Sequence, residues 1–177
     1  MQKALIVYGT KTGTAAVTAQ EIAQALQNKG VETKVVDAKK EKIRSITEYD
    51  LIIVGSVIQI GRWNSEPENF IKKYKQELAK KNLALYVNCG SAAEKLNPEK
   101  PEIAANAKTK YLDEKAAKYN LKPVALGFFG AIYNFNTMSW IMRKGMENER
   151  PKLAANYKET APGVYDTRDV DAIQKWT

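Results

Sequence analysis

The sequence predicts an α/β fold in which helices cover both faces of a five-stranded parallel sheet. Apolar runs of strand length alternate along the chain with amphipathic stretches of helix length. One run, from Leu51 to Val54, is apolar without interruption, which is typical of a strand that is covered on both faces. Strands that alternate with helices pair in parallel through right-handed crossovers.

The strands are expected at residues 4–8, 33–37, 51–56, 83–88 and 124–131. The helices are expected at residues 14–28, 65–80, 102–119 and 137–148, followed by a short one with Val170, Ile173 and Trp176 on one face. In the fourth helix the apolar spacing places Met138, Ile141, Met142 and Met146 inward. Residues 93–101 and 149–167 are charged and contain proline, so we expect loops or insertions there.

The composition limits the kinds of functional site that the chain can form. The 177 residues suffice for one domain with a full core, and we expect a single domain over residues 1–177. The chain has a net charge of +8, no histidine and one cysteine, Cys89. This excludes an internal disulfide, histidine acid–base catalysis and a zinc site of cysteine and histidine, and we expect no metal. The positive charge favours anionic partners, or it marks only a solvated lysine-rich surface.

No apolar run approaches the roughly 18 residues that a membrane span needs. The first residues pass directly into a strand pattern, without the basic stretch and long apolar core of a signal peptide. Together with the single cysteine, these features predict a cytoplasmic protein with no transmembrane segment.

The loop between the first strand and the first helix is a candidate phosphate site. It consists of Thr10, Lys11, Thr12, Gly13 and Thr14. Bare N–H groups and the positive end of the helix dipole hold a phosphate at such a place. A Walker A loop and a dinucleotide fingerprint do not fit, because they require a Gly-Lys-Ser/Thr ending and three glycines, respectively. An ordinary threonine-rich helix cap is the structural alternative.

Residues 6–14 resemble the FMN phosphate loop of the flavodoxin family, and the order of strands and helices resembles that family over nearly the whole chain. The resemblance implies a flavodoxin-like three-layer sandwich with the flavodoxin strand order 2-1-3-4-5 and non-covalently bound FMN. It implies that residues 10–14 hold the phosphate. Ala15 stands where flavodoxins usually carry another hydroxyl residue, so one phosphate contact could be missing.

The resemblance implies two further cofactor loops. After the third strand, the ring would be wrapped by Ser56, Val57, Ile58, Gln59, Ile60 and Gly61. Gly61 resembles the glycine whose peptide flips to accept a hydrogen bond from reduced flavin N5, which only glycine does cheaply. Flavodoxins often place an aromatic residue where Ile60 stands. Trp63 either supplies the stacking instead or packs against a helix.

After the fourth strand, the pyrimidine edge would be bound by Asn88, Cys89, Gly90 and Ser91 through their backbone groups. This loop often carries a tyrosine that stacks on the ring, but residues 88–100 contain none. One ring face is therefore open, or another segment covers it. We expect Cys89 to be a small packing residue and not a redox thiol.

The resemblance leads to two functions. As an electron carrier, the protein needs no catalytic residue because the cofactor supplies the chemistry, and its basic surface would suit an acidic ferredoxin. Alternatively, residues 55–61, 68–73 and 128–133, with Trp140 and Arg143, resemble the menaquinone-dependent protoporphyrinogen oxidases. That likeness implies an FMN-dependent porphyrinogen oxidase or quinone reductase.

The sequence gives weaker indications of other partners. Peripheral contact with a membrane and a homodimer through residues 128–146 are both open, although a buried helix would explain the same apolar stretch. We do not expect a nucleic-acid partner, because the lysines are scattered over the helices and are not gathered with aromatic residues on a sheet face.

Overall fold

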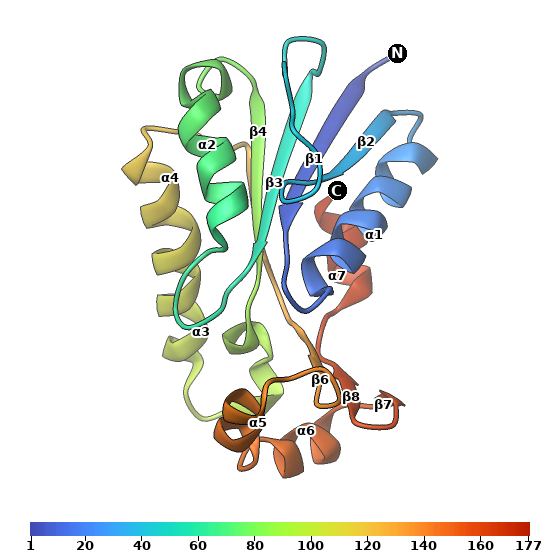
Figure 1. Ribbon diagram of the computed structural model, residues 1–177, viewed down its shortest axis with the longest axis vertical. Coiled ribbons are helices and arrows are strands. Elements are labelled where there is room, and N and C mark those ends of the chain that lie inside the picture. The colour runs from blue at the N-terminus through green and yellow to red at the C-terminus, as the bar shows by residue number, and fades with distance from the viewer.

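A five-stranded parallel sheet in the order β2-β1-β3-β4-β5 forms the centre of the protein. The computed structural model describes all residues from Met1 to Thr177. The strands are β1 (Lys3–Gly9), β2 (Glu32–Asp37), β3 (Leu51–Val57), β4 (Asn82–Asn88) and β5 (Ala125–Phe129). Helices lie on both faces of the sheet (Figure 1). The predicted α/β class and strand order are confirmed.

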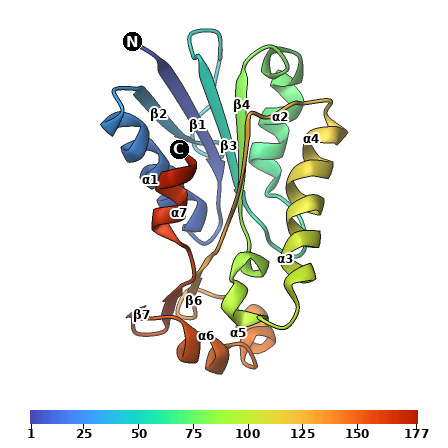
Figure 2. The same ribbon diagram turned by 180° about the vertical axis from the view of Figure 1, so that it is seen from behind.

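The helices divide into two layers. On one face lie α1 (Thr14–Asn28) and α7 (Val170–Trp176), and on the other lie α2 (Ser65–Leu78), α3 (Pro101–Lys108) and α4 (Glu114–Lys118) (Figure 2). The helix expected over residues 102–119 is interrupted by a π-helical turn, η3 (Thr109–Asp113). None of the helices has the length and the apolar character needed to cross a membrane.

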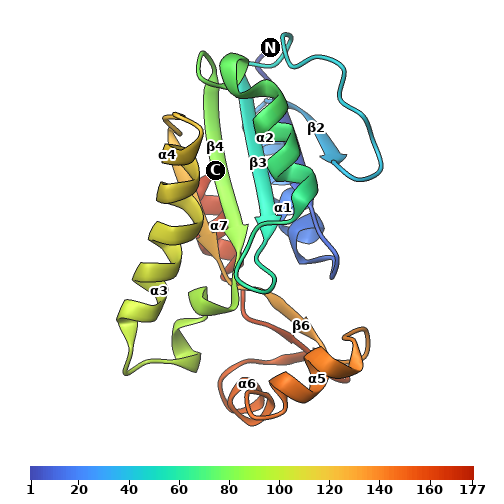
Figure 3. The same cartoon turned by 60° about the vertical axis from the view of Figure 1, so that its left-hand side comes forward.

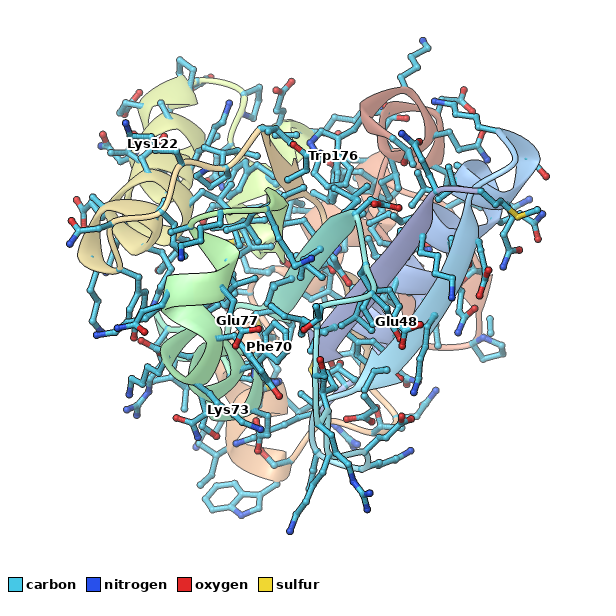
Figure 4. All side chains as sticks on the ribbon, turned by 90° about the horizontal axis from the view of Figure 1, so that it is seen from above. Glu48, Phe70, Lys73, Glu77, Lys122 and Trp176 are labelled. Carbon is cyan, nitrogen blue, oxygen red and sulfur yellow. The ribbon has the colours of Figure 1, made fainter.

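The sheet separates two hydrophobic clusters. Side chains of β1 alternate between them: Ala4 and Ile6 pack on the side of α1, and Leu5 and Val7 pack on the side of α2. All four are fully buried, which is why the strand is apolar at successive positions. On the first side α7 sets Trp176 (labelled in Figure 4) edge-on to Phe129, with ring centroids 5.6 Å apart.

Residues 132–166 form a separate layer, here called the C-terminal unit, beyond the carboxyl ends of the parallel strands (Figures 1 and 3). Its antiparallel sheet has the order β6-β8-β7. The strands are β6 (Ile132–Asn134), β7 (Glu159–Ala161) and β8 (Val164–Asp166), and the helices are α5 (Trp140–Met146) and α6 (Arg150–Asn156). Residues 149–167 are therefore a structured part of an insertion.

The C-terminal unit has its own small core, which includes Phe135, Leu153 and Tyr165. Met138 and Met146 pack against this core, but Ile141 is 66% exposed, so its predicted inward position is wrong. Ser139 caps α5, and the helix therefore begins later than predicted. The core of the unit is small, and Met138 before α5 and Met146 at its end cover it.

A half-buried carboxylate joins α2 to the end of α4. Glu68 Oε1 accepts hydrogen bonds from the Tyr119 hydroxyl at 2.7 Å and from Lys118 Nζ at 3.0 Å, and Lys115 Nζ lies 2.9 Å away. Burial acts to raise the pKa of Glu68, but these three donors outweigh it and lower the pKa from 4.5 to about 2. Because the folded-state pKa is depressed, the stabilisation is present above about pH 4.5 and is lost as the pH falls toward 2.

Glu68→Gln is therefore expected to lower the free energy of unfolding by about 2 kcal/mol at pH 7 and by much less near pH 2. Urea unfolding at the two pH values measures this difference. Glu66→Gln, two residues earlier on the same helix and in no ion pair, is the control and should change stability by less than about 0.5 kcal/mol. An equal loss for Glu68→Gln at both pH values would contradict the assignment.

Candidate functional site

Three loops meet at the carboxyl ends of β1, β3 and β4. Loop one is residues 10–13, loop two is residues 58–64 and loop three is residues 89–93. β1 lies between β2 and β3, so the chain adds β2 on one side of β1 and then crosses to add β3 on the other. α/β sheets bind ligands at such a switch point. The backbone N–H of Ile58 donates to the Asn88 carbonyl at 2.8 Å, which joins loop two to β4.

Gly9 allows loops one and two to pack closely. A Cβ atom at Gly9 would lie 2.3 Å from Pro67 Cδ and 3.4 Å from Asn64 Cβ. These distances leave no room for a side chain, so the first turn of α2 rests directly on the end of β1.

Loop one turns sharply into α1. Gly13 has a φ of 89° and precedes the helix, and no side chain caps the first turn. The Gly13 N–H donates to Thr10 Oγ1 at 2.8 Å, which fixes the shape of the loop. A Cβ atom at Gly13 would meet nothing within 4 Å. The first-turn N–H groups therefore have neither a capping side chain nor an acidic neighbour, and Lys11 and Thr12 are exposed beside them.

Thr14 and Ala15 can offer this loop only backbone groups. Thr14 is 1% exposed and Ala15 is fully buried. The Thr14 hydroxyl lies 3.3 Å from the Ile132 N–H and 3.4 Å from its carbonyl oxygen, so it points toward the C-terminal unit and away from the loop.

Loop two contains a tight turn with strained geometry. Gln59 and Arg62 exchange backbone hydrogen bonds of 3.0 and 3.2 Å, and Ile60 and Gly61 between them have φ values of 48° and 71°. A branched side chain disfavours this conformation by about 1–2 kcal/mol. Ile60 nevertheless adopts it and is 87% exposed, so the backbone hydrogen bonds of the turn, and not packing of the Ile60 side chain, offset the strain.

Before this turn, Ser56 and Val57 are buried. The Ser56 hydroxyl accepts a hydrogen bond from the Asn64 N–H at 2.9 Å and donates to the Val57 carbonyl at 3.1 Å. It therefore joins the two ends of loop two. Ile58 and Gln59 are half-buried at the start of the loop.

Trp63 does not stack at this edge. It is 3% exposed, lies in the cluster beneath α2, and its Nε1 donates to the Tyr111 carbonyl at 2.8 Å. The second of the two predicted roles, packing, is the one that the structure shows. The turn at Ile60 and Gly61 returns the chain to the sheet, and Trp63 therefore enters the core.

Loop three is anchored by buried side chains. Asn88 is fully buried, and its Nδ2 donates to Thr18 Oγ1 at 3.0 Å and to the Gly130 carbonyl at 2.8 Å. Cys89 is 5% exposed, and burial raises the pKa of its thiol, which agrees with a packing role. Gly90 and Ser91 are half-buried at the start of the loop.

Two tyrosines from outside the loops lie beside them: Tyr111, which the sequence did not indicate, and Tyr133, which belongs to the segment 128–133 noted above. A Cβ atom at Gly90 would lie 2.1 Å from the Tyr133 hydroxyl, and one at Gly61 would lie 3.7 Å from the Tyr111 hydroxyl. Burial raises the pKa of Tyr133 well above its ordinary value. Both tyrosines come from segments far along the chain, so a search for aromatic residues within the loops could not find them.

Two cavities adjoin loop three. One, of about 610 Å³, is lined by Ala92 of that loop, the end of β5, Lys95, Tyr157 and residues 167–172. A second cavity of about 400 Å³ lies between Ser91, Lys100 and Ile103. We place the candidate site at the edge formed by the three loops, because the uncapped N–H groups and the strained turn are there and not in these cavities.

Comparison with known proteins agrees with the fold. A family model described as a flavodoxin domain matches residues 5–152. The fold is similar to that of a flavodoxin from the domain Archaea, with a TM-score of 0.52 and 20% identity over 73% of this chain and 85% of that one. It is also similar to two-electron reduced Megasphaera elsdenii flavodoxin, with a TM-score of 0.53 and 18% identity over 71% of this chain and 84% of that one.

In sequence, the chain is 26% identical over 84 residues to protoporphyrinogen IX dehydrogenase [quinone] of Escherichia coli K12. The match covers 48% of this chain and 46% of that protein, so it spans about half the length of the curated relative. The solved structures share the fold, and the family model covers most of the sequence. The chain belongs to the flavodoxin-domain family.

Proposed function

We propose that this protein binds FMN non-covalently at the edge formed by the three loops and carries electrons between redox partners. The observation that supports this most is loop one, where Gly13 leaves the first turn of α1 uncapped and open. FMN would supply the redox chemistry when bound, and the chain would bind and orient it.

The proposal assigns three groups of contacts. The phosphate would be held by Thr10, Lys11, Thr12, Gly13, Thr14 and Ala15. The ring would lie against residues 56–61, and its pyrimidine edge would meet the backbone of residues 88–91. Tyr111 and Tyr133 are the aromatic side chains closest to loops two and three, and either could cover a ring face.

The residues at this edge fit such a group. Asn64 is 6% exposed, and its Nδ2 is a buried donor without a partner beside Gly9. An unpaired donor costs about 1–3 kcal/mol, which an oxygen-rich ligand at the junction of loops one and two would offset. Loops one and two also present exposed Lys11 and Arg62, which suit a phosphate and an acidic partner.

Ile60→Asn tests whether the strained turn serves the cofactor. Asparagine tolerates a positive φ, so the variant should be more stable than the parent by about 1 kcal/mol. It should bind FMN several-fold more weakly because an exposed apolar contact is lost. Thermal unfolding and FMN titration measure the two effects.

Asn120→Ile is the matched control, since Asn120 has a φ of 53° after α4, away from the loops. It should lose stability and keep its FMN affinity. If Ile60→Asn left the FMN affinity unchanged, the strain at Ile60 would have no role in binding.

An acidic ferredoxin is the partner class that the charge favours. The segments at the three loops, residues 10–15, 56–64 and 88–93, contain no carboxylate, and the whole chain carries +8. Association with an acidic protein should therefore be fast at low ionic strength and slow as salt screens the charges. We also propose a cytoplasmic location, where ferredoxins and reduced thiols coexist.

The experiment is an anaerobic titration of the FMN-loaded protein, followed by its optical spectrum, with a reduced acidic ferredoxin as donor. Reduction whose rate falls with ionic strength would support the carrier. A protein that takes up no FMN would overturn the proposal, and a rate insensitive to salt would refute electrostatic docking.

Enzymatic oxidation of a porphyrinogen, or reduction of a quinone, is a second candidate. The partial likeness to protoporphyrinogen IX dehydrogenase [quinone] favours it. Multiple turnovers with protoporphyrinogen and a menaquinone analogue would support this function. Inactivity of the FMN-loaded protein would exclude it.

A further inference from the structure

Helix α5 presents large apolar side chains to solvent. Trp140 is 74% exposed and its neighbour Ile141 is 66% exposed, and no residue of α5 is buried. The helix belongs to the C-terminal unit, at the end of the molecule where the strands finish (Figure 3). Two adjacent apolar side chains exposed to this degree indicate a contact that the chain alone does not provide.

The two charged side chains of α5 are both basic, and the nearest carboxylate along the chain, Glu147, follows the helix. Arg143 and Lys144 follow Trp140 and Ile141 on the same helix, and residues 134–146 contain no aspartate or glutamate. Neither cation forms an ion pair. Tryptophan beside lysine and arginine is the combination that favours the interface of a bilayer with anionic lipids.

We propose that α5 docks this protein onto an anionic membrane surface. Trp140 and Ile141 enter the headgroup region, and Arg143 and Lys144 pair with lipid phosphates. Since α5 lies beyond the carboxyl ends of the strands, docking turns the end that carries the three loops toward the bilayer. The inference goes beyond the proposed function and does not depend on FMN.

A second copy of the chain fits this surface less well. A stable interface buries about 800 Å² on each partner, whereas α5 offers two exposed apolar side chains on a helix of seven residues. A two-fold dimer through α5 would also bring both copies of Arg143 and Lys144 together, and like charges repel.

Co-sedimentation of the purified full chain with lipid vesicles tests the proposal. The chain should bind phosphatidylcholine vesicles that contain phosphatidylglycerol, and bind pure phosphatidylcholine vesicles far less. Arg143→Gln/Lys144→Gln should weaken binding by about 25-fold, since each basic residue contributes about fivefold. Trp140→Ala/Ile141→Ser should weaken it by about tenfold or more, because the apolar area is lost.

The controls remove the same features from the opposite end of the molecule. Lys80→Gln/Lys122→Gln makes the same change in net charge at exposed positions, and Lys122 is labelled in Figure 4, which views that end. Val124→Ala trims a side chain that is 66% exposed. Both controls should bind within about twofold of the parent, since they leave the contact untouched.

Three results would overturn the proposal. One is that the parent chain binds neither kind of vesicle. Another is that Lys80→Gln/Lys122→Gln weakens binding as much as Arg143→Gln/Lys144→Gln. The third is a dimer in analytical ultracentrifugation that Trp140→Ala/Ile141→Ser dissociates while vesicle binding is unchanged, which would assign α5 to self-association through residues 128–146.

Discussion

Gly13→Val is expected to weaken FMN binding by about a hundredfold or more, whereas Gly30→Val should leave it nearly unchanged. The two glycines flank α1 and have similar backbone angles, with φ values of 89° and 80°, and a Cβ atom at either would meet nothing within 4 Å. Valine therefore strains the backbone equally at both places. Only at Gly13 would the side chain stand over the uncapped N–H groups to which we assign the phosphate.

Titration of FMN fluorescence gives the affinities, and thermal unfolding shows whether the two valine variants lose the same stability. Lys11→Ala should weaken binding only about tenfold, because it removes one charge-assisted contact from an exposed side chain. Equal FMN affinity in the parent, Lys11→Ala and Gly13→Val would refute the assignment of loop one. Equal weakening by Gly13→Val and Gly30→Val would show that affinity follows stability and not the loop.

The parallel sheet could be predicted because its strands are buried on both faces. Leu5 and Ile6 pack into different clusters on opposite sides of β1, so burial leaves a continuous apolar run in the sequence. The long amphipathic helices α1 and α2 were equally evident. They end within two residues of their predicted limits. Gly30 follows α1, and the polar residues 80–82 follow α2.

The C-terminal unit has no comparable pattern of apolar residues in the sequence. Its strands have three residues each, and β7 is exposed along its whole length, so alternation has too few positions to be recognised. Its core also takes Ala93 and Leu96 from a segment that precedes α3. A core built from two distant segments depends on tertiary contacts that local periodicity does not record.

Loop one could be proposed from sequence because Gly9, Gly13, the threonines and the helix are adjacent along the chain. The other parts of the site depend on tertiary structure. Trp63 lies two residues after Gly61, yet the turn places it in the core. Tyr133 lies far from Gly90 in sequence, yet its hydroxyl fills the space that a side chain there would need.

Arg168→Met is expected to lower the free energy of unfolding by about 3–5 kcal/mol, because it leaves two partly buried carboxylates without their cation. The Arg168 side chain is 3% exposed. Its NH1 lies 2.8 Å from Glu21 Oε2 and its NH2 lies 2.7 Å from Asp166 Oδ2. This pairing fixes β8 of the C-terminal unit to α1. The exposed pair of Lys34 and Glu41 provides a control, and Lys34→Met should cost less than about 1 kcal/mol.

The loss should depend on pH. In the parent, burial raises the pKa of Glu21 and Arg168 acts against that effect, so removing the arginine should raise the pKa of this carboxyl further. A carboxyl whose pKa is higher in the folded state than in the unfolded state destabilises the fold as the pH rises through those values. Arg168→Met should therefore lose more stability at pH 8 than at pH 5, as measured by urea unfolding.

Hydrogen exchange locates the same effect within the molecule. If Arg168 holds the C-terminal unit against α1, the amides of β6 and β8 should lose protection in Arg168→Met before those of β1 and β3 do. Because the Thr14 hydroxyl and Gly90 both lie against β6, the variant should also bind FMN more weakly although no assigned contact has changed. Uniform loss of protection over both sheets would instead mean that the two parts unfold together, with Arg168 stabilising the whole fold.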